Sequence, residues 1–125
     1  ADLDDNGWLD MVVRDLVGPA KIYLSRCGEE SWLRVRLHAP APNTFGLGAE
    51  VRVIANNAVQ QRWIHSGNTS VFVGVPPETH FGLGDLETVQ LEVRWPDGQV
   101  TTFDDVPTRR IVDVHLTEWA HDVKK

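Results

Sequence analysis

The chain has 125 residues, which is long enough to bury a hydrophobic core as one domain without disulfide or metal cross-links. Its formal net charge of −6 and isoelectric point near 5.2 repel phosphate backbones and argue against nucleic acid as a general partner. No stretch approaches the length of a membrane-spanning apolar helix, so no transmembrane segment is expected, and the single cysteine, Cys27, excludes an intramolecular disulfide.

Residues 2–10 carry oxygen-bearing side chains at the first, third, fifth and ninth positions of a loop, with glycine at the sixth. Calcium takes oxygen ligands on a tightly curled backbone, and Gly7 permits that curl. An EF-hand would place a glutamate at the twelfth position, but Val13 stands there in an apolar, strand-like run. The alternative is a surface turn without metal, since Asp, Asn and Gly also favour turns through local hydrogen bonds. The predicted calcium ligands are the side chains of Asp2, Asp4, Asn6 and Asp10 and the backbone carbonyl of Trp8.

This loop resembles the calcium-binding repeat of integrin-type β-propellers, the FG-GAP or VCBS repeat, in which the pattern D-x-D-x-[DN]-G-x-x-D precedes an apolar strand. The resemblance implies that residues 1–28 are the C-terminal part of such a repeat, folded as a β-hairpin remnant, and that residues 29–125 form a separate domain. The resemblance also implies that the half of the repeat that would orient Asp2 lies before Ala1. We therefore expect calcium to bind weakly or not at all here, and more tightly when the full repeat is present.

Alternation of apolar and polar residues predicts four half-buried strands, and less regular apolar runs predict four more. Many short strands with frequent turn signals favour an all-β fold, either an antiparallel β-sandwich or a partly open barrel. Asn56-Asn57 and Pro96-Asp97-Gly98 are typical of hairpin turns, and one helical turn is predicted near Pro107 to Arg110. The predicted strands are 32–37, 51–53, 89–95 and 112–116, with 21–25, 58–65, 70–75 and 99–103. The predicted core residues are Leu33, Val35, Leu37, Val51, Val53, Leu91, Val93, Val112 and Val114.

The tetrapeptide Phe-Gly-Leu-Gly occurs twice, at 45–48 and 81–84. It is not a dinucleotide fingerprint, because Val51 and Glu87 stand where a third glycine would be needed and no helix follows. We expect the glycines to allow positive φ at bulges or corners, with the Phe and Leu side chains buried. A backbone-lined ligand edge is the alternative. His80, which precedes the second copy, is expected to pin that turn through a hydrogen bond.

Four further motifs follow one another in an order that resembles the ASPIC/UnbV domain. They are Trp32-Leu33-Arg34-Val35-Arg36-Leu37, Gly46-Leu47-Gly48-Ala49-Glu50-Val51, His80-Phe81-Gly82-Leu83-Gly84 and Val93-Arg94-Trp95-Pro96-Asp97-Gly98. That domain typically follows FG-GAP or VCBS repeats at the C-terminus of cartilage acidic protein-like and bacterial secreted proteins. The resemblance covers roughly residues 30–116 and implies an extracellular, periplasmic or cell-surface location. The family's biochemical role is poorly defined, and residues 66–77 depart from its usual Ser/Gly/Tyr-rich turn, so no ligand contact is carried over.

No residue arrangement predicts an enzyme. The histidines lack the H-E-x-x-H spacing of a zinc site, and no G-x-S-x-G elbow surrounds Ser66 or Ser70. The acidic pairs Glu29-Glu30 and Asp104-Asp105 are adjacent in sequence, and neighbouring residues of an extended chain point in opposite directions. We therefore predict no catalytic centre, and surface or core-edge positions for the histidines.

The polar faces of the predicted strands form a candidate ligand face. Arginines alternate there with acidic and amide residues, which is typical of a solvated face held by cross-strand pairs. The alternative is a platform on which an exposed tryptophan stacks against a sugar and arginines bind a carboxylate or sulfate. The residues of this predicted face are Trp32, Arg34, Arg36, Arg52 and Arg94, alternating with Glu50, Gln90 and Glu92.

The sequence thus favours a non-catalytic extracellular binding or adhesion module at the C-terminus of a calcium-binding β-propeller protein, whose partner is an extracellular protein or a glycan. A carbohydrate-binding module that uses exposed tryptophans is the second hypothesis. Nucleic-acid binding ranks third, because it requires the four arginines to cluster, and an enzyme ranks last.

Overall fold

The fold is all-β. The computed structural model describes residues 2–26, 28–67 and 74–118, and these ranges contain nine strands and no helix, hence none that could cross a membrane. The predicted strand at 70–75 lies mostly outside the described residues, as do Cys27, Ser70 and His121. The strands are β1 (Met11–Val13), β2 (Lys21–Tyr23), β3 (Ser31–His38), β4 (Glu50–Ala55), β5 (Ala58–Trp63), β6 (Glu78–Gly84), β7 (Thr88–Arg94), β8 (Val100–Pro107) and β9 (Arg110–His115).

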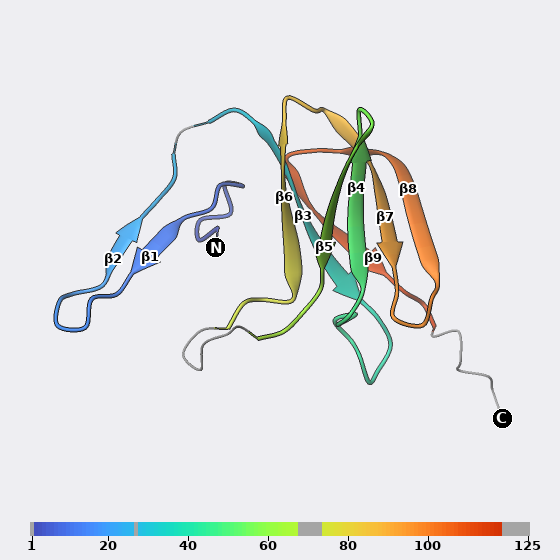
Figure 1. Cartoon of the computed structure of the whole chain (residues 1–125), viewed down its shortest axis with the longest axis horizontal. Coiled ribbons are helices and arrows are strands. Elements are labelled where there is room, and N and C mark those ends of the chain that lie inside the picture. The colour runs from blue at the N-terminus through green and yellow to red at the C-terminus, as the bar shows by residue number, and fades with distance from the viewer. Residues whose placement is uncertain (1, 27, 68–73, 119–125) are drawn as a thin grey trace.

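Two sheets pack as the layers of a sandwich, one with strand order β6-β3-β9 and the other with order β5-β4-β7-β8 (Figure 1). The sheets do not close into a barrel, so the predicted β-sandwich is confirmed. One pairing differs from the antiparallel expectation, because β3 and β9 run parallel, with Leu33 opposite Arg110 and Leu37 opposite Val114. The chain leaves the four-stranded sheet at the end of β8 and enters the three-stranded sheet as β9, which pairs there with β3 and with no other strand of the described residues.

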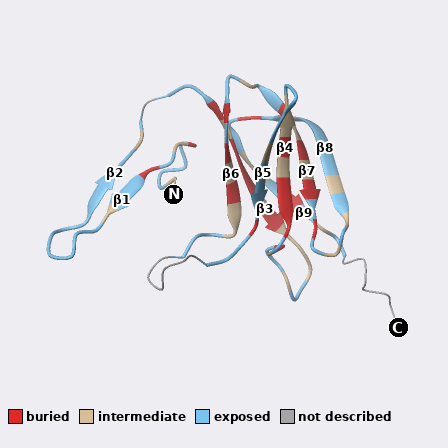
Figure 2. Ribbon diagram, viewed as in Figure 1, coloured by how far each residue is buried: buried red, intermediate tan, exposed pale blue. Residues whose placement is uncertain are grey.

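The core lies between these two sheets, where the strands are coloured as buried in Figure 2. Its side chains share one parity on each strand, as period-two alternation requires. Each fully buried aliphatic side chain contributes about 1.5–3 kcal/mol relative to exposure. The predicted core is confirmed except at Val112, which is only partly buried against it. The buried members of the predicted set are Leu33, Val35, Leu37, Val51, Val53, Leu91, Val93 and Val114, and Phe81 and Trp95 are the largest further members.

Backbone conformation explains the two Phe-Gly-Leu-Gly motifs. Gly46 and Gly48 have φ of 60° and 89°, and a Cβ on Gly46 would lie 3.0 Å from the Trp95 ring, so the first copy needs glycine as predicted. The second copy forms the end of β6, and there only the last glycine has positive φ. Phe81 is buried, but Phe45 is 52% exposed, so the expectation that both Phe rings are buried is wrong for the first copy.

Two turn predictions had different outcomes. Asn56 and Asn57 both have positive φ and join β4 to β5, which confirms the hairpin turn. The helical turn predicted near Pro107 is wrong, because β8 continues to Pro107 and β9 begins at Arg110. The Thr108 hydroxyl donates to the carbonyls of Leu86 and Glu87, and Arg109 has φ of 57°, which a right-handed helix cannot accommodate.

The β1–β2 hairpin projects away from the sandwich (Figure 1). Its apolar side chains are largely exposed, including Val12, Ile22 and Tyr23, and Leu16 and Val17 at its tip are fully exposed. A two-stranded hairpin with no apolar face covered is marginally stable at best in water. This hairpin therefore presents an apolar surface that nothing in the described ranges covers.

Candidate functional site: an acidic loop docked on the sandwich

Residues 2–10 curl around the side chain of Asp2. Its carboxylate accepts hydrogen bonds from the backbone N–H groups of Asn6 at 3.1 Å and Gly7 at 2.8 Å. Asp5 and Gly7 take positive φ, of 56° and 93°, which only glycine and short polar residues adopt readily. The curl predicted from the glycine at the sixth position is thus present.

Asp10 closes the loop against the hairpin. Its two carboxylate oxygens accept from the backbone N–H groups of Leu3 at 2.7 Å and Ser25 at 2.8 Å. The Asn6 side chain also takes part, since its amide nitrogen donates to the Ser25 carbonyl and its oxygen accepts from the Trp8 N–H. The segment that follows β2 is thereby held to the loop, although sequence spacing gave no indication of Ser25.

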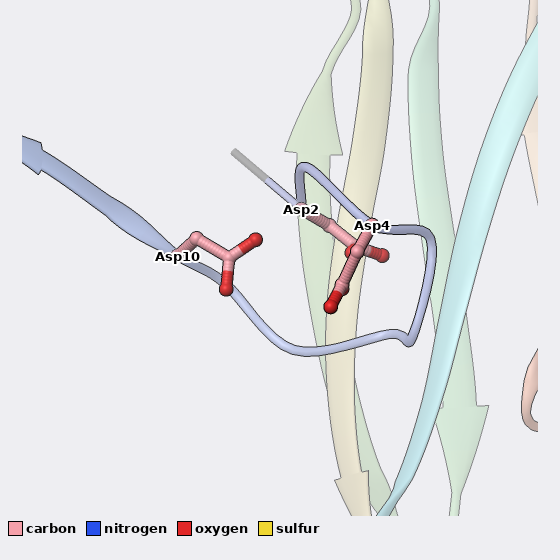
Figure 3. A group of neighbouring side chains, drawn as sticks. All are labelled: Asp2, Asp4 and Asp10. Carbon is pink, nitrogen blue, oxygen red and sulfur yellow. The ribbon is translucent and has the colours of Figure 1, made fainter. Parts of the chain in front are cut away.

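The carboxylates of Asp2, Asp4 and Asp10 each offer an oxygen within 4.8 Å of the other two. Figure 3 shows Asp10 where the chain approaches β1, facing Asp2 and Asp4 across the loop. Two oxygens about 2.3–2.6 Å from a shared calcium ion are at most about 5 Å apart, so the spacing of these side chains fits a hard divalent cation. The further predicted ligands, Asn6 and the Trp8 carbonyl, belong to the same loop but stay predictions.

The carboxylate of Asp10 should make the loop sensitive to acid. The N–H groups of Leu3 and Ser25 lower the pKa of this carboxylic acid, because they stabilise its ionised form. Because the pKa of Asp10 is lower in the folded chain than in the unfolded chain, its ionised carboxylate stabilises the fold at pH values above the ordinary carboxyl pKa of about 4. This stabilisation is lost as the pH falls through the lowered pKa. We therefore expect hydrogen-exchange protection of these two amides to hold down to that value and to fall below it. Nuclear magnetic resonance would measure this, and Asp10→Asn should remove the acid transition. An acid transition that is the same in the wild type and in Asp10→Asn would contradict it.

Arg34 joins the loop to the outer face of the three-stranded sheet. Its guanidinium forms an ion pair with Asp2 and a second with Asp5 at 2.9 Å, and Glu78 of β6 lies 3.7 Å away. Arg34 is 4% exposed because the loop covers it. The prediction that Arg34 faces solvent is therefore wrong, since alternation shows which side of a strand a residue occupies but not what covers that side.

Gly7 contacts the same face of the sheet. A Cβ on Gly7 would lie within 2.4 Å of three atoms of the Trp32 indole, so only glycine permits this approach. The His80 Nε2 donates to the Gly7 carbonyl at 2.9 Å, and the His80 ring lies parallel to the Trp32 ring at 6.2 Å. His80 thus holds the N-terminal loop, and the expectation that it pins the Phe-Gly-Leu-Gly turn is wrong.

The remaining residues of the predicted ligand face do not join Trp32 and Arg34. Arg36 lies on β3 and pairs with Glu78 at 2.8 Å, whereas Arg52 and Arg94 lie on β4 and β7 of the other sheet. Arg52 pairs with Glu92 at 2.9 Å across the strands, as the solvated-ladder interpretation expects. The outer faces of two packed sheets point in opposite directions, so this structure does not bring the five side chains together. The arginine cluster that nucleic-acid binding would need is likewise absent from the described residues.

Two of the other described histidines, His38 and His65, also contact oxygen atoms of the protein. His38 lies 2.7 Å from the Asp113 carboxylate and stacks on His115, and the His65 ring meets the Trp63 carbonyl at 3.0 Å. None of these contacts involves a serine, threonine or cysteine nucleophile. The arrangement gives no starting point for acyl transfer at these positions.

Comparison with known proteins gives one family. Residues 39–120 match the sequence profile of the family described as ASPIC and UnbV. Cartilage acidic protein 1 of Xenopus tropicalis is 30% identical over 105 residues, and the protein of the same name from Homo sapiens is 29% identical over 109 residues. Each comparison covers 81% of this chain but 16% of the relative, so the chain spans a small part of the proteins it matches.

Proposed function

Because this chain belongs to the ASPIC and UnbV family, we propose that it is a non-catalytic binding module of an extracellular protein, placed at the end of a calcium-binding β-propeller. The relatives' name, cartilage acidic protein, refers to a tissue composed largely of extracellular matrix and supports this location. The net charge of −6 agrees with that name and disfavours nucleic acid as a partner. The partner is an extracellular protein or a glycan.

The hairpin supports the proposed propeller context. Its exposed apolar residues, such as Val12, Ile22 and Leu16, are what the outer strands of a larger sheet would present to their neighbours. The loop before it carries the pattern of an FG-GAP or VCBS calcium repeat. A preceding repeat that packed against the faces of this hairpin would cover these side chains.

One observation supports the proposal above others: the acidic loop is docked on the sandwich through a buried arginine. Arg34 belongs to the sandwich, whereas Asp2 and Asp5 belong to the loop. The acidic loop and the sandwich therefore form one continuous surface. A calcium ion at Asp2, Asp4 and Asp10 would supply a positive charge that offsets their mutual repulsion and holds this surface in place.

Calcium should bind this loop with a dissociation constant near the range of extracellular modules, about 10⁻⁴–10⁻³ M, and more tightly when the preceding repeat is present. Calcium binds the folded loop and not the open chain, so saturation should raise the thermal stability of the hairpin region. Asp4→Asn should weaken binding by about tenfold or more, because it removes one of three carboxylates. Calorimetry and amide chemical shifts of residues 2–10 would measure both effects.

Asp15→Asn is the matched control for this experiment. Asp15 is also an exposed acidic residue of the N-terminal region, but it pairs with Lys21 at 3.4 Å and lies outside the carboxylate cluster. Its replacement should leave calcium affinity unchanged. If calcium produces neither heat nor chemical-shift changes in the longer protein, the loop is an acidic turn and the calcium part of the proposal fails.

The binding function is tested separately with the full-length protein. Affinity capture from extracellular matrix extract, in calcium and in chelator, should recover a specific component that the sandwich binds directly when purified. Arrays of immobilised glycans would test the other class of partner. If neither class binds, the module is structural and the binding proposal fails, whatever the outcome of the calcium titration.

A further inference from the structure

A cleft of about 480 Å³ opens between the N-terminal loop and the edge of the three-stranded sheet. One wall is the backbone and side chains of Gly7 to Leu9, and the other is formed by the beginning of β3 and the end of β6. A second hollow of about 400 Å³ shares Trp8, Glu30 and Trp32 with the first. These volumes fall within the range of about 300–1,000 Å³ that is usual for small-molecule sites.

Two tryptophans line both hollows, and each is held by a close backbone contact. Gly7 lies against the Trp32 indole, and Gly28 lies so near Trp8 that a Cβ there would be 2.2 Å from its ring. His80 lies parallel to Trp32 and bonds to the Gly7 carbonyl. Both indoles are thus fixed before any ligand arrives, which lowers the entropic cost of binding.

Polar groups surround the aromatic walls. Ser31 lines the cleft, but it is 2% exposed and its hydroxyl oxygen is buried without a hydrogen-bond partner among the described residues, so this group is not open to a ligand. Glu30 and Arg62 add a charged acceptor and a charged donor at the exposed edge of the cleft.

Gly82 and Gly84 of β6 line the cleft and have no side chains to fill it. A Cβ on Gly82 or Gly84 would meet no atom within 4 Å, and Gly82 does not have positive φ. These glycines belong to the second Phe-Gly-Leu-Gly motif, for which a backbone-lined ligand edge was the alternative interpretation. Open space above a strand backbone is what a flat ligand would need there.

We infer that this cleft binds a saccharide of one or two rings, with the apolar face of a sugar against Trp8 or Trp32 and its hydroxyls toward Glu30 and Arg62. Amphipathic rings with many hydroxyls match apolar indoles beside both donors and acceptors. Phosphorylated ligands fit less well, because each hollow offers one arginine, Arg62 or Arg109, and this charge is offset by Glu30 in the first hollow and outnumbered by Glu29 and Glu30 in the second. This inference rests on the proposed binding function and specifies its ligand class.

The test uses the full chain in calcium and a variant that fills the cleft, Gly82→Leu. The probes are the methyl glycosides of glucose, galactose, mannose and N-acetylglucosamine, together with β-linked disaccharides of the same sugars. Saturation-transfer magnetic resonance and tryptophan fluorescence would detect binding. We expect at least one probe to bind, and Gly82→Leu to weaken it by about tenfold or more.

Gly74→Leu is the matched control, because Gly74 also has open space around its Cβ position and no positive φ but does not line the cleft. It should bind the same probe with unchanged affinity. The inference is overturned if no probe binds, or if Gly82→Leu binds as well as the wild type while its melting temperature is unchanged.

A different ligand class would also overturn the inference. If extended peptides bind, Gly82→Leu blocks their binding and no saccharide binds, the free edge of β6 is a peptide site. In that case the proposed binding function still stands. If the capture and array experiments find no partner at all, both the saccharide inference and the proposed binding function fail.

Discussion

Arg34→Met is expected to release the N-terminal loop from the sandwich while leaving the sandwich folded. The Asp2 side chain is 2% exposed and the Arg34 side chain 4%, so removal of the guanidinium leaves a buried carboxylate without its counter-charge. Loss of one partner of a buried ion pair costs about 3–5 kcal/mol. The loop can avoid this cost by moving into water, so the loss should appear as undocking of residues 2–10 and not as global unfolding.

Hydrogen exchange at the Asn6 and Gly7 amides, which donate to Asp2, would measure this undocking. Arg36→Met is the matched control, because Arg36 lies on the same strand with the same parity but is 42% exposed and pairs with Glu78 at 2.8 Å. Exposed pairs of this kind contribute about 0–1 kcal/mol, so loop exchange should change little. Equal exchange in wild type and Arg34→Met would mean that the ion pair does not hold the loop.

Arg34 and Arg36 also show what the sequence alone could not predict, namely which of two outward-facing arginines is buried. Period-two alternation placed Leu33, Val35 and Leu37 in the core correctly, because burial between two sheets depends only on which side of the strand a residue occupies. Arg34 and Arg36 have identical patterns, and nothing local distinguishes the buried one from the half-exposed one. The distinction comes from a loop about 30 residues earlier in the chain, whose position against β3 is a tertiary contact.

The loop itself was easier to predict than its surroundings. Asp2, Asp4 and Asp10 converge because the chain between them must curl, and that curl is encoded by Asp5 and Gly7. The partners that fix the loop, Arg34, His80 and the Ser25 backbone, are distant in sequence. The cleft lined by Trp8 and Trp32 follows from the same docking, so it could not be located from spacing.

The parallel placement of β9 beside β3 had no local signal either. The alternation of residues 112–116 predicts a strand but not its direction or its neighbour. Direction follows from the crossover at Thr108 and Arg109, where the chain leaves one sheet for the other. Hydrogen bonds from Thr108 to the end of the β6–β7 connection fix this crossover, and these contacts join residues that are 21 and 22 positions apart in the sequence.

Phe81→Ala is expected to destabilise the sandwich by about 3–5 kcal/mol, whereas Phe45→Ala should change its stability by no more than about 0.5 kcal/mol. The two residues begin identical tetrapeptides, so local sequence is matched and only tertiary position differs. Phe81 is 0% exposed, lies opposite Leu33 in the three-stranded sheet and fills the space between the layers, so its removal leaves a cavity that the surrounding side chains cannot fully close. Phe45 is 52% exposed in the loop before β4, where truncation removes little buried area.

Urea denaturation followed by tryptophan fluorescence would measure both free energies of unfolding. Similar losses for the two variants would mean that Phe45 is also packed in solution, and that the difference between the two motifs does not come from burial in the sandwich.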